Sequence, residues 1–154
     1  MKTISPVDLE KRVSGKKILI DTNIIIYLTD LVEPYVKLSR LLFEMIEKGS
    51  VTACLSVISI VEVMQGPIRK GLNEKALDVK NYLLNFPNTV CQSLDKDVLG
   101  QIGSVQSVQW EKLRTIDSII IASGLKNRVD WFISNDTHFK KALPKSRLIT
   151  FDQG

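Results

Sequence analysis

Short apolar runs alternate along this chain with longer segments whose apolar residues recur at helical spacing. The runs predict strands at residues 17–21, 51–55, 89–92, 131–134 and 147–150. The segments between them predict helices at residues 34–49, 56–65, 73–86, 95–107 and 115–126. Parallel neighbouring strands need long crossover connections, and helices of this length supply them. We therefore expect an α/β fold, in which helices cover both faces of a central parallel sheet of four to five strands.

Local residue types set the expected limits of several elements. Ser56 and Thr115 are placed to cap the helices that follow them, and Gly66 with Pro67 is expected to end the helix at residue 65. A chain of 154 residues can bury a sizeable core, so we expect residues 1–154 to form a single domain. The first 16 residues are polar and are expected to form an extension with a loosely packed helix.

The apolar runs are too short for a membrane protein. The run at residues 119–122 is among the longest, whereas a helix that spans a bilayer needs about 20 apolar residues. The first residues also lack the apolar core of a signal peptide, so we expect a cytoplasmic protein without membrane contact. Cys54 and Cys91 lie in apolar surroundings without the spacing of a zinc site, and we expect reduced, buried thiols.

Acidic residues stand at four places where an apolar run gives way to polar residues. They are Asp21, Glu62, Asp117 and Asp136. Asp21 and Asp136 follow the first and fourth expected strands, and ligands of open α/β sheets bind at the carboxyl ends of strands. Clustered carboxylates repel one another unless a cation offsets their charge. Mg²⁺ and Mn²⁺ prefer oxygen ligands, and such a site can hydrolyse phosphodiesters.

Polar and basic residues near these acids are candidates for supporting roles. Those expected to orient the acids are Thr22, Asn23, Ser59, Ser134 and Asn135. Capping and turn formation explain each of them equally well. The net charge of +4 mildly favours a polyanionic partner, and Arg114 and Lys140 are candidate contacts for backbone phosphates. The single histidine, His138, excludes a histidine-pair ribonuclease mechanism and is expected to be a surface residue rather than a ligand.

Four motifs in this order resemble those of the PIN-domain ribonucleases. They are I-D-T-N at residues 20–23, S-x-x-E at 59–62, D-S-I-I-I-A at 117–122 and S-N-D-x-x-F at 134–139. In size and spacing the chain is most similar to VapC-type toxins of toxin–antitoxin systems. Two positions depart from the common pattern, because His138 stands where many members carry an aspartate and Ser59 replaces a frequent threonine.

The resemblance implies a metal site and a substrate. It implies that all four acids build a site for Mg²⁺, for which Mn²⁺ can substitute, with Asp21 and Asp117 as direct ligands. Asn23 and Ser134 would support the acids. The resemblance further implies an RNA substrate, frequent homodimers and inhibition by a small antitoxin protein.

Three functions remain open at this stage. The first is a metal-dependent endoribonuclease that acts as the toxin of a toxin–antitoxin pair. The second is a PIN nuclease of RNA processing or quality control without an antitoxin, and the third is a catalytically silent PIN fold that binds RNA or protein. A haloacid-type phosphatase fits poorly, because it needs a second aspartate two residues after the first, where this chain has Asn23.

Overall fold

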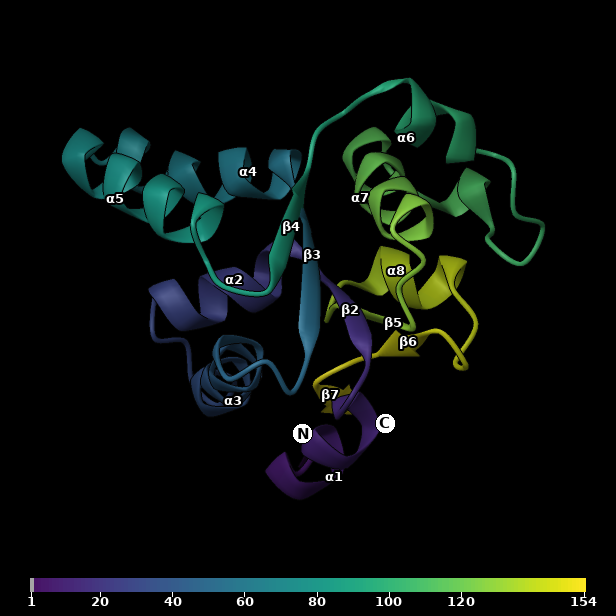
Figure 1. Ribbon diagram of the computed structural model, residues 1–154, viewed down its shortest axis with the longest axis horizontal. Helices are drawn as coiled ribbons and strands as arrows, with labels where there is room; N and C mark the ends of the chain where they lie inside the picture. The colour runs from purple at the N-terminus through teal and green to yellow at the C-terminus, as the bar shows by residue number, and fades with distance from the viewer. Residues whose placement is uncertain (1) are drawn as a thin grey trace.

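A five-stranded parallel sheet forms the centre of the computed structural model, which describes residues 2–154 (Figure 1). Its strands lie in the order β4-β3-β2-β5-β6, and every neighbouring pair is parallel. The strands are β2 (Lys17–Ile20), β3 (Thr52–Ser56), β4 (Thr89–Gln92), β5 (Trp131–Ile133) and β6 (Leu148–Ile149). The predicted α/β class with a parallel sheet is therefore confirmed.

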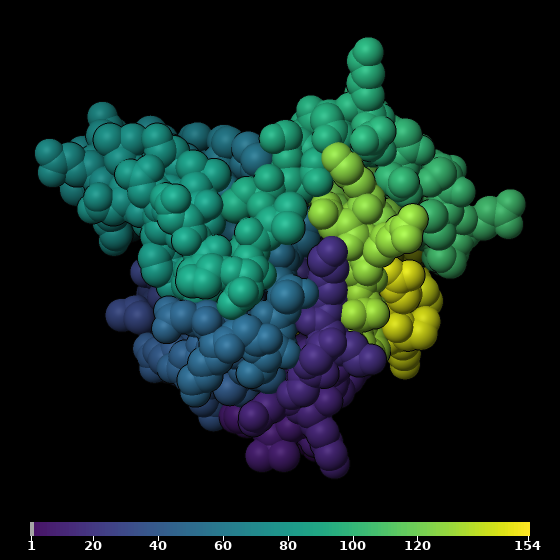
Figure 2. Space-filling view, in the orientation of Figure 1, coloured from purple at the N-terminus to yellow at the C-terminus, as the bar shows by residue number. Residues whose placement is uncertain are grey.

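Helices cover both faces of this sheet. They are α1 (Pro6–Val13), α2 (Thr22–Thr29), α3 (Val36–Glu47), α4 (Val57–Arg69), α5 (Asn73–Leu84), α6 (Lys96–Gln101), the 3-10 helix η1 (Trp110–Lys112), α7 (Thr115–Lys126) and α8 (Thr137–Ala142). Two short strands, β1 (Lys2–Thr3) and β7 (Asp152–Gln153), pair with each other outside the sheet. Helices α4 and α5 pack together and project from the body of the molecule (Figures 1 and 2).

Alternation along the strands separates two hydrophobic clusters. Ile18 and Ile20 of β2 belong to the cluster that includes α2 and α3, whereas Leu19 between them belongs to the cluster with α7 and α8. Successive side chains of a strand point to opposite faces, so one four-residue strand contributes to both cores.

Helix α7 approaches the sheet closely at Gly124. A Cβ atom added there would lie 2.5 Å from the Phe132 ring and 3.1 Å from Leu19 Cγ. No larger residue fits without displacing the core, so this glycine sets the distance between α7 and the sheet. Asp117 lies in the first turn of the same helix, which leads into β5.

Two predicted helix limits are wrong. Helix α4 continues through Gly66 and Pro67 to Arg69, because Pro67 lies in the last turn and its missing N–H removes only one helical bond. Helix α6 ends at Gln101 instead of residue 107, because Gly103 has a φ of +80° and turns the chain out of the helical path. Leu99 of this short helix is 57% exposed.

The first 16 residues pack more tightly than their composition led us to expect. Ser5 caps α1, whose Leu9 and Val13 are fully buried. These two residues lie four positions apart and form an apolar stripe on an otherwise polar helix. The organisation of residues 1–154 as a single domain stays a prediction.

The two cysteines are free thiols, as predicted. Burial raises the pKa of the Cys54 thiol to about 12, so this thiol is protonated at neutral pH. Cys91 is half-buried, so the expectation that both thiols are buried is wrong for this residue. Across residues 2–154, none of the helices combines the length and the hydrophobicity that crossing a membrane requires.

Candidate active site

Helix N-termini position three of the four acids. Asp21 follows β2 and caps α2, and Asp136 follows β5 and caps α8. Asp117 lies in the first turn of α7, whereas Glu62 lies farther along α4. A carboxylate is favourable at each of these helix N-termini, because it accepts bonds from free backbone N–H groups.

Asp21 is the most constrained acid of the cluster, with only 4% of its surface exposed. Its Oδ1 accepts a bond of 2.8 Å from the Thr22 N–H, and its Oδ2 accepts one of 2.6 Å from the Ser134 hydroxyl. Burial raises the pKa of this carboxyl to about 7. The two hydrogen bonds lower it, and the nearby charges of Asp136 and Asp117 raise it further.

Arg114 joins Asp117 to Asp136. Its Nε lies 2.8 Å from Asp117 Oδ2, and its Nη2 lies 3.1 Å from Asp117 Oδ1 and 2.7 Å from Asp136 Oδ2. Hydrogen bonding to Asp117 raises the pKa of the Arg114 guanidinium above its ordinary value. Sequence reasoning treated Arg114 as a phosphate contact and missed this bridge, although the spacing of three residues to Asp117 was a signal for it.

Arg114 also replaces the expected cap of α7. Thr115 is the first helical residue, and Arg114 before it has the extended backbone of a cap residue. The Arg114 N–H donates a bond of 3.3 Å to Asp117 Oδ2. The expectation that Thr115 caps this helix is therefore wrong, because the acid three residues after Arg114 turns back to the chain and closes the first turn.

Glu62 reaches the other acids through Thr22. The Thr22 hydroxyl donates a bond of 2.6 Å to Glu62 Oε1, and the N–H of the same residue bonds Asp21. One turn earlier on α4, the Ser59 hydroxyl is fully buried and has no hydrogen-bond partner among the described residues. Ser59 is therefore a polar group at this site whose bonding capacity is unused.

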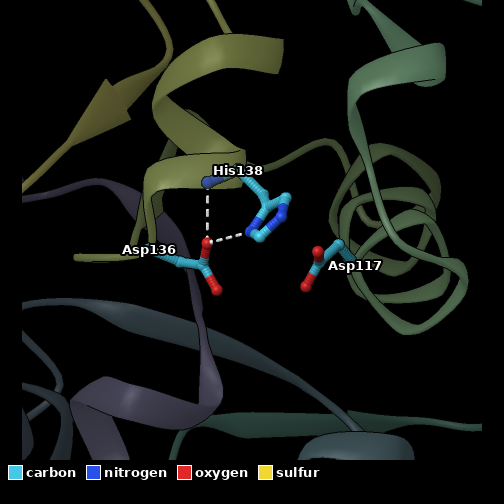
Figure 3. Close-up of side chains that lie close together, drawn as sticks. All are labelled: Asp117, Asp136 and His138. Atoms are coloured by element: carbon cyan, nitrogen blue, oxygen red, sulfur yellow. Dashed lines mark hydrogen bonds and ion pairs between the residues drawn. The ribbon is translucent and has the colours of Figure 1, made fainter.

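His138 lies within the acid cluster. Its Nδ1 is 2.9 Å from Asp136 Oδ1, which also accepts a bond of 2.7 Å from the His138 backbone N–H. Asp117, Asp136 and His138 each offer a ligand atom, and these atoms lie within 4.8 Å of one another (Figure 3). Sequence reasoning placed His138 at the surface, whereas its half-exposed imidazole borders the acids.

Ser134 and two asparagines connect the acids through a second group of bonds. The Ser134 hydroxyl, bonded to Asp21, also accepts a bond of 3.0 Å from the Asp136 N–H. Asn23 Oδ1 accepts a bond of 3.2 Å from the Asn135 N–H, and Asn23 Nδ2 lies 3.4 Å from Asp21 Oδ2. The loop after β5 is thus attached to the start of α2.

Lys140 is separate from this group. It is exposed on α8, and with Arg12 and Lys145 it lines a cavity of about 380 Å³ that does not include the acids.

The donor set suits a hard divalent cation. Asp117 and Asp136 share the Arg114 guanidinium and lie beside His138. Asp21 is linked to Asp136 through the Ser134 hydroxyl, and Glu62 is linked to Asp21 through Thr22. Burial disfavours the charged form of Asp21. Carboxylate oxygens are the ligands that Mg²⁺ and Mn²⁺ prefer, and an unpartnered hydroxyl such as that of Ser59 could bond a coordinated water.

Comparison with known proteins places the chain in a family. Residues 18–142 match the family model of the PIN domain. The match covers most of the chain, which therefore belongs to the PIN domain family. No curated protein sequence matches it.

Solved structures of toxin–antitoxin proteins share the fold. VapBC2 of Rickettsia felis, bound to a DNA fragment from its promoter, is 16% identical over 88% of this chain and 99% of that chain, with a TM-score of 0.63. DNA-bound VapBC of Salmonella typhimurium is 17% identical over 89% of this chain and 99% of that chain, with a TM-score of 0.64. VapC20 of Mycobacterium tuberculosis, a toxin that cleaves the sarcin–ricin loop, is 13% identical over 80% of this chain and 93% of that chain, with a TM-score of 0.61. The resemblance to VapC-type proteins is thus confirmed at the level of the fold.

Proposed function

We propose that this protein is a metal-dependent endoribonuclease that hydrolyses RNA phosphodiester bonds. The observation that carries the proposal is the gathering of four acids at the carboxyl edge of the sheet, in a chain of the PIN domain family. The catalytic and metal-binding residues would be Asp21, Glu62, Asp117 and Asp136. The similarity to VapC20, a toxin that cleaves the sarcin–ricin loop, supports RNA as the substrate that we propose.

Asp21 and Asp117 are the proposed direct ligands of Mg²⁺ or Mn²⁺. Glu62 and Asp136 would contribute directly or through water. A divalent cation supplies a Lewis acid that polarises a phosphoryl oxygen and stabilises the charge that develops there. Ser134 and Thr22 hold Asp21 in one orientation, and Thr22 also holds Glu62, so the carboxylates are positioned before a ligand arrives.

Arg114 has two alternative binding partners in this proposal, the acids of the site and an RNA phosphate. In the structure it neutralises Asp117 and Asp136, and its side chain is 59% exposed. With these acids holding a divalent cation, the Arg114 guanidinium would be released and would be able to bind a backbone phosphate, for which its planar set of N–H donors is suited. Lys140, one turn along α8 from Asp136, would contact the same strand of RNA.

The biological role that we propose is the toxin of a toxin–antitoxin pair. The fold similarity to VapBC proteins supports a small antitoxin as partner, and a homodimer would fit the same assembly. The net charge of +4 supports a polyanionic substrate, and we propose a cytoplasmic location.

Two substitutions that remove a charge but nearly keep the side-chain shape test the enzyme assignment. Asp117→Asn and Asp21→Asn should reduce Mg²⁺-dependent RNA cleavage by on the order of a hundredfold or more, because each removes charge where the cation would bind. Asp78→Asn, on the exposed surface of α5, is the matched control and should cleave like the wild type. Calorimetry with Mn²⁺ should show binding to the wild type and the control only. Wild-type cleavage by purified Asp117→Asn protein would overturn the proposal.

A further inference from the structure

The two short strands β1 and β7 pair with each other outside the matched family region, and we call this pair the terminal brace. Strand β7 follows β6 near the C-terminal end and pairs antiparallel with β1, in the register Lys2 with Gln153 and Thr3 with Asp152 (Figure 1). Both strands lie outside residues 18–142, which match the PIN domain. The brace is anchored by Phe151, which is fully buried and bonds the Ile4 N–H through its carbonyl oxygen at 2.8 Å.

Asp152 of this brace forms two hydrogen bonds with the side chain of Asn135. The Asp152 N–H donates a bond of 2.9 Å to Asn135 Oδ1, and Asn135 Nδ2 donates one of 3.1 Å to Asp152 Oδ2. The second amide hydrogen of Asn135 is directed to the Tyr27 hydroxyl at 3.3 Å. Both donor hydrogens of the Asn135 amide and its oxygen are therefore engaged, which fixes the side chain in one orientation.

Asn135 stands between two residues of the acid cluster. On one side is Ser134, whose hydroxyl bonds Asp21 Oδ2 at 2.6 Å, and on the other is Asp136. The Asn135 backbone N–H bonds Asn23 Oδ1 at 3.2 Å. A rotation of this short segment would move the Ser134 hydroxyl and the Asp136 carboxylate together, so the orientation of Asn135 governs the spacing between Asp21 and Asp136.

We infer that Asp152 is a positioning residue of the proposed nuclease site, which it serves by clamping Asn135. The clamp consists of the reciprocal bonds between Asp152 and Asn135. It also gives the N-terminal extension a role, because β1 holds β7 in place. The inference rests on the proposed function for its catalytic consequence, whereas the geometry of the clamp is independent of that function.

A purely structural role predicts different behaviour, and Tyr35 allows the two to be separated. The Tyr35 hydroxyl donates a bond of 2.7 Å to Asp152 Oδ1, the oxygen that does not bond Asn135. Tyr35→Phe therefore removes one bond from Asp152 but leaves the clamp on Asn135 intact. Asp152→Ala removes the side-chain half of the clamp. Asp152→Asn keeps it, because the amide oxygen can accept from Asn135 while the Tyr35 hydroxyl accepts from the new amide.

The experiment compares these three variants of the full chain by amide hydrogen exchange and by RNA cleavage. In Asp152→Ala, the amides of Asn135 and Asp136 should exchange about tenfold faster or more, because their bonds to Asn23 Oδ1 and to the Ser134 hydroxyl depend on the position of the clamped segment. The kcat for cleavage should fall about ten- to a hundredfold with little change in KM, because displaced groups lose transition-state contacts. Asp152→Asn should restore both properties, and Tyr35→Phe should leave both near the wild-type values even if its Tm falls.

The outcomes separate this inference from the proposed function. If the wild type neither cleaves RNA nor binds Mn²⁺, the proposed function fails, and the exchange rates alone still decide whether Asp152 orders the segment. Unchanged exchange and unchanged kcat in Asp152→Ala would overturn the inference, as would equal losses in Tyr35→Phe. Faster exchange with unchanged kcat in an active enzyme would also overturn it. Should Asp152→Ala fail to fold, Asn135→Ala breaks the same pair from the other side and must show the same signature.

Discussion

Asp21 should make the metal-free protein less stable at alkaline pH than at acid pH. Burial raises the pKa of its carboxyl from 3.8 to about 7 in the folded state. The folded protein therefore holds this proton more tightly than the unfolded chain does. The contribution of Asp21 to stability is then complete below the unfolded pKa, falls as the pH rises from about 4 to about 7, and stays low above that range.

The magnitude follows from the size of the shift. Each pKa unit corresponds to about 1.4 kcal/mol, so a rise of about three units costs about 4 kcal/mol at pH 8. At pH 4, close to the unfolded pKa of 3.8, a substantial fraction of the unfolded carboxyl is also protonated, and the cost falls below about 1 kcal/mol. Asp21→Asn mimics the protonated form and keeps an acceptor for the Thr22 N–H. We therefore expect it to stabilise the metal-free protein by about 3–4 kcal/mol at pH 8, and only slightly at pH 4.

Urea denaturation in the presence of a chelator measures this difference. The midpoint of Asp21→Asn should exceed that of the wild type at pH 8, with equal m-values, and the two midpoints should converge at pH 4. Asp78→Asn, exposed on α5, controls for the change in net charge and should match the wild type at both pH values. Saturating Mn²⁺ should reverse the order at pH 8, because only the wild type gains binding energy. A stabilisation that does not depend on pH, or a loss of stability at pH 8, would refute the reasoning.

Two further substitutions test individual contacts. Arg114→Gln should tighten Mn²⁺ binding in calorimetry by about two- to tenfold, because the guanidinium no longer competes for Asp117 and Asp136; unchanged affinity, as expected for the control Lys112→Gln, would contradict this. Gly124→Ala should lower the free energy of unfolding by about 1–3 kcal/mol, because its Cβ would lie 2.5 Å from the Phe132 ring. The matched change Gly66→Ala in α4, where nothing lies within 4 Å, should instead raise the free energy of unfolding by about 0.5–1 kcal/mol in the same urea titration. A Gly124→Ala protein as stable as the wild type would show that α7 can move away from the sheet.

Much of the fold follows from local sequence signals. Strand β4 occupies the predicted residues because its apolar run is bounded by Pro87 and by polar residues after Gln92. Helix α5 likewise begins at the predicted Asn73. The errors occur where two local signals compete. Pro67 does not end α4, because one missing hydrogen bond in the final turn costs little. The apolar periodicity after residue 101 does not extend α6, because the positive φ of Gly103 turns the chain out of the helix.

The candidate site divides in the same way. Strand ends and helix starts are local features, so the positions of Asp21 and Asp136 could be predicted from the sequence. The contacts of Arg114 and His138 could not, because they depend on side-chain rotamers and on the distance between α7 and α8. That distance is set by packing such as the approach of Gly124 to Phe132, and no sequence motif encodes it.

The bridge formed by Arg114 offsets part of the negative charge of the cluster. Asp117 and Asp136 share one guanidinium, which lies 2.8 Å from Asp117 Oδ2 and 2.7 Å from Asp136 Oδ2. Asp21 has no such partner; its bonds come from neutral groups, and it carries the raised pKa of the cluster. At the proposed metal site, Asp21 would therefore gain most from a divalent cation, whereas Asp117 and Asp136 would have to exchange Arg114 for it. The affinity of the proposed site would then depend on how strongly Arg114 competes for these two acids, and Arg114→Gln measures that competition directly.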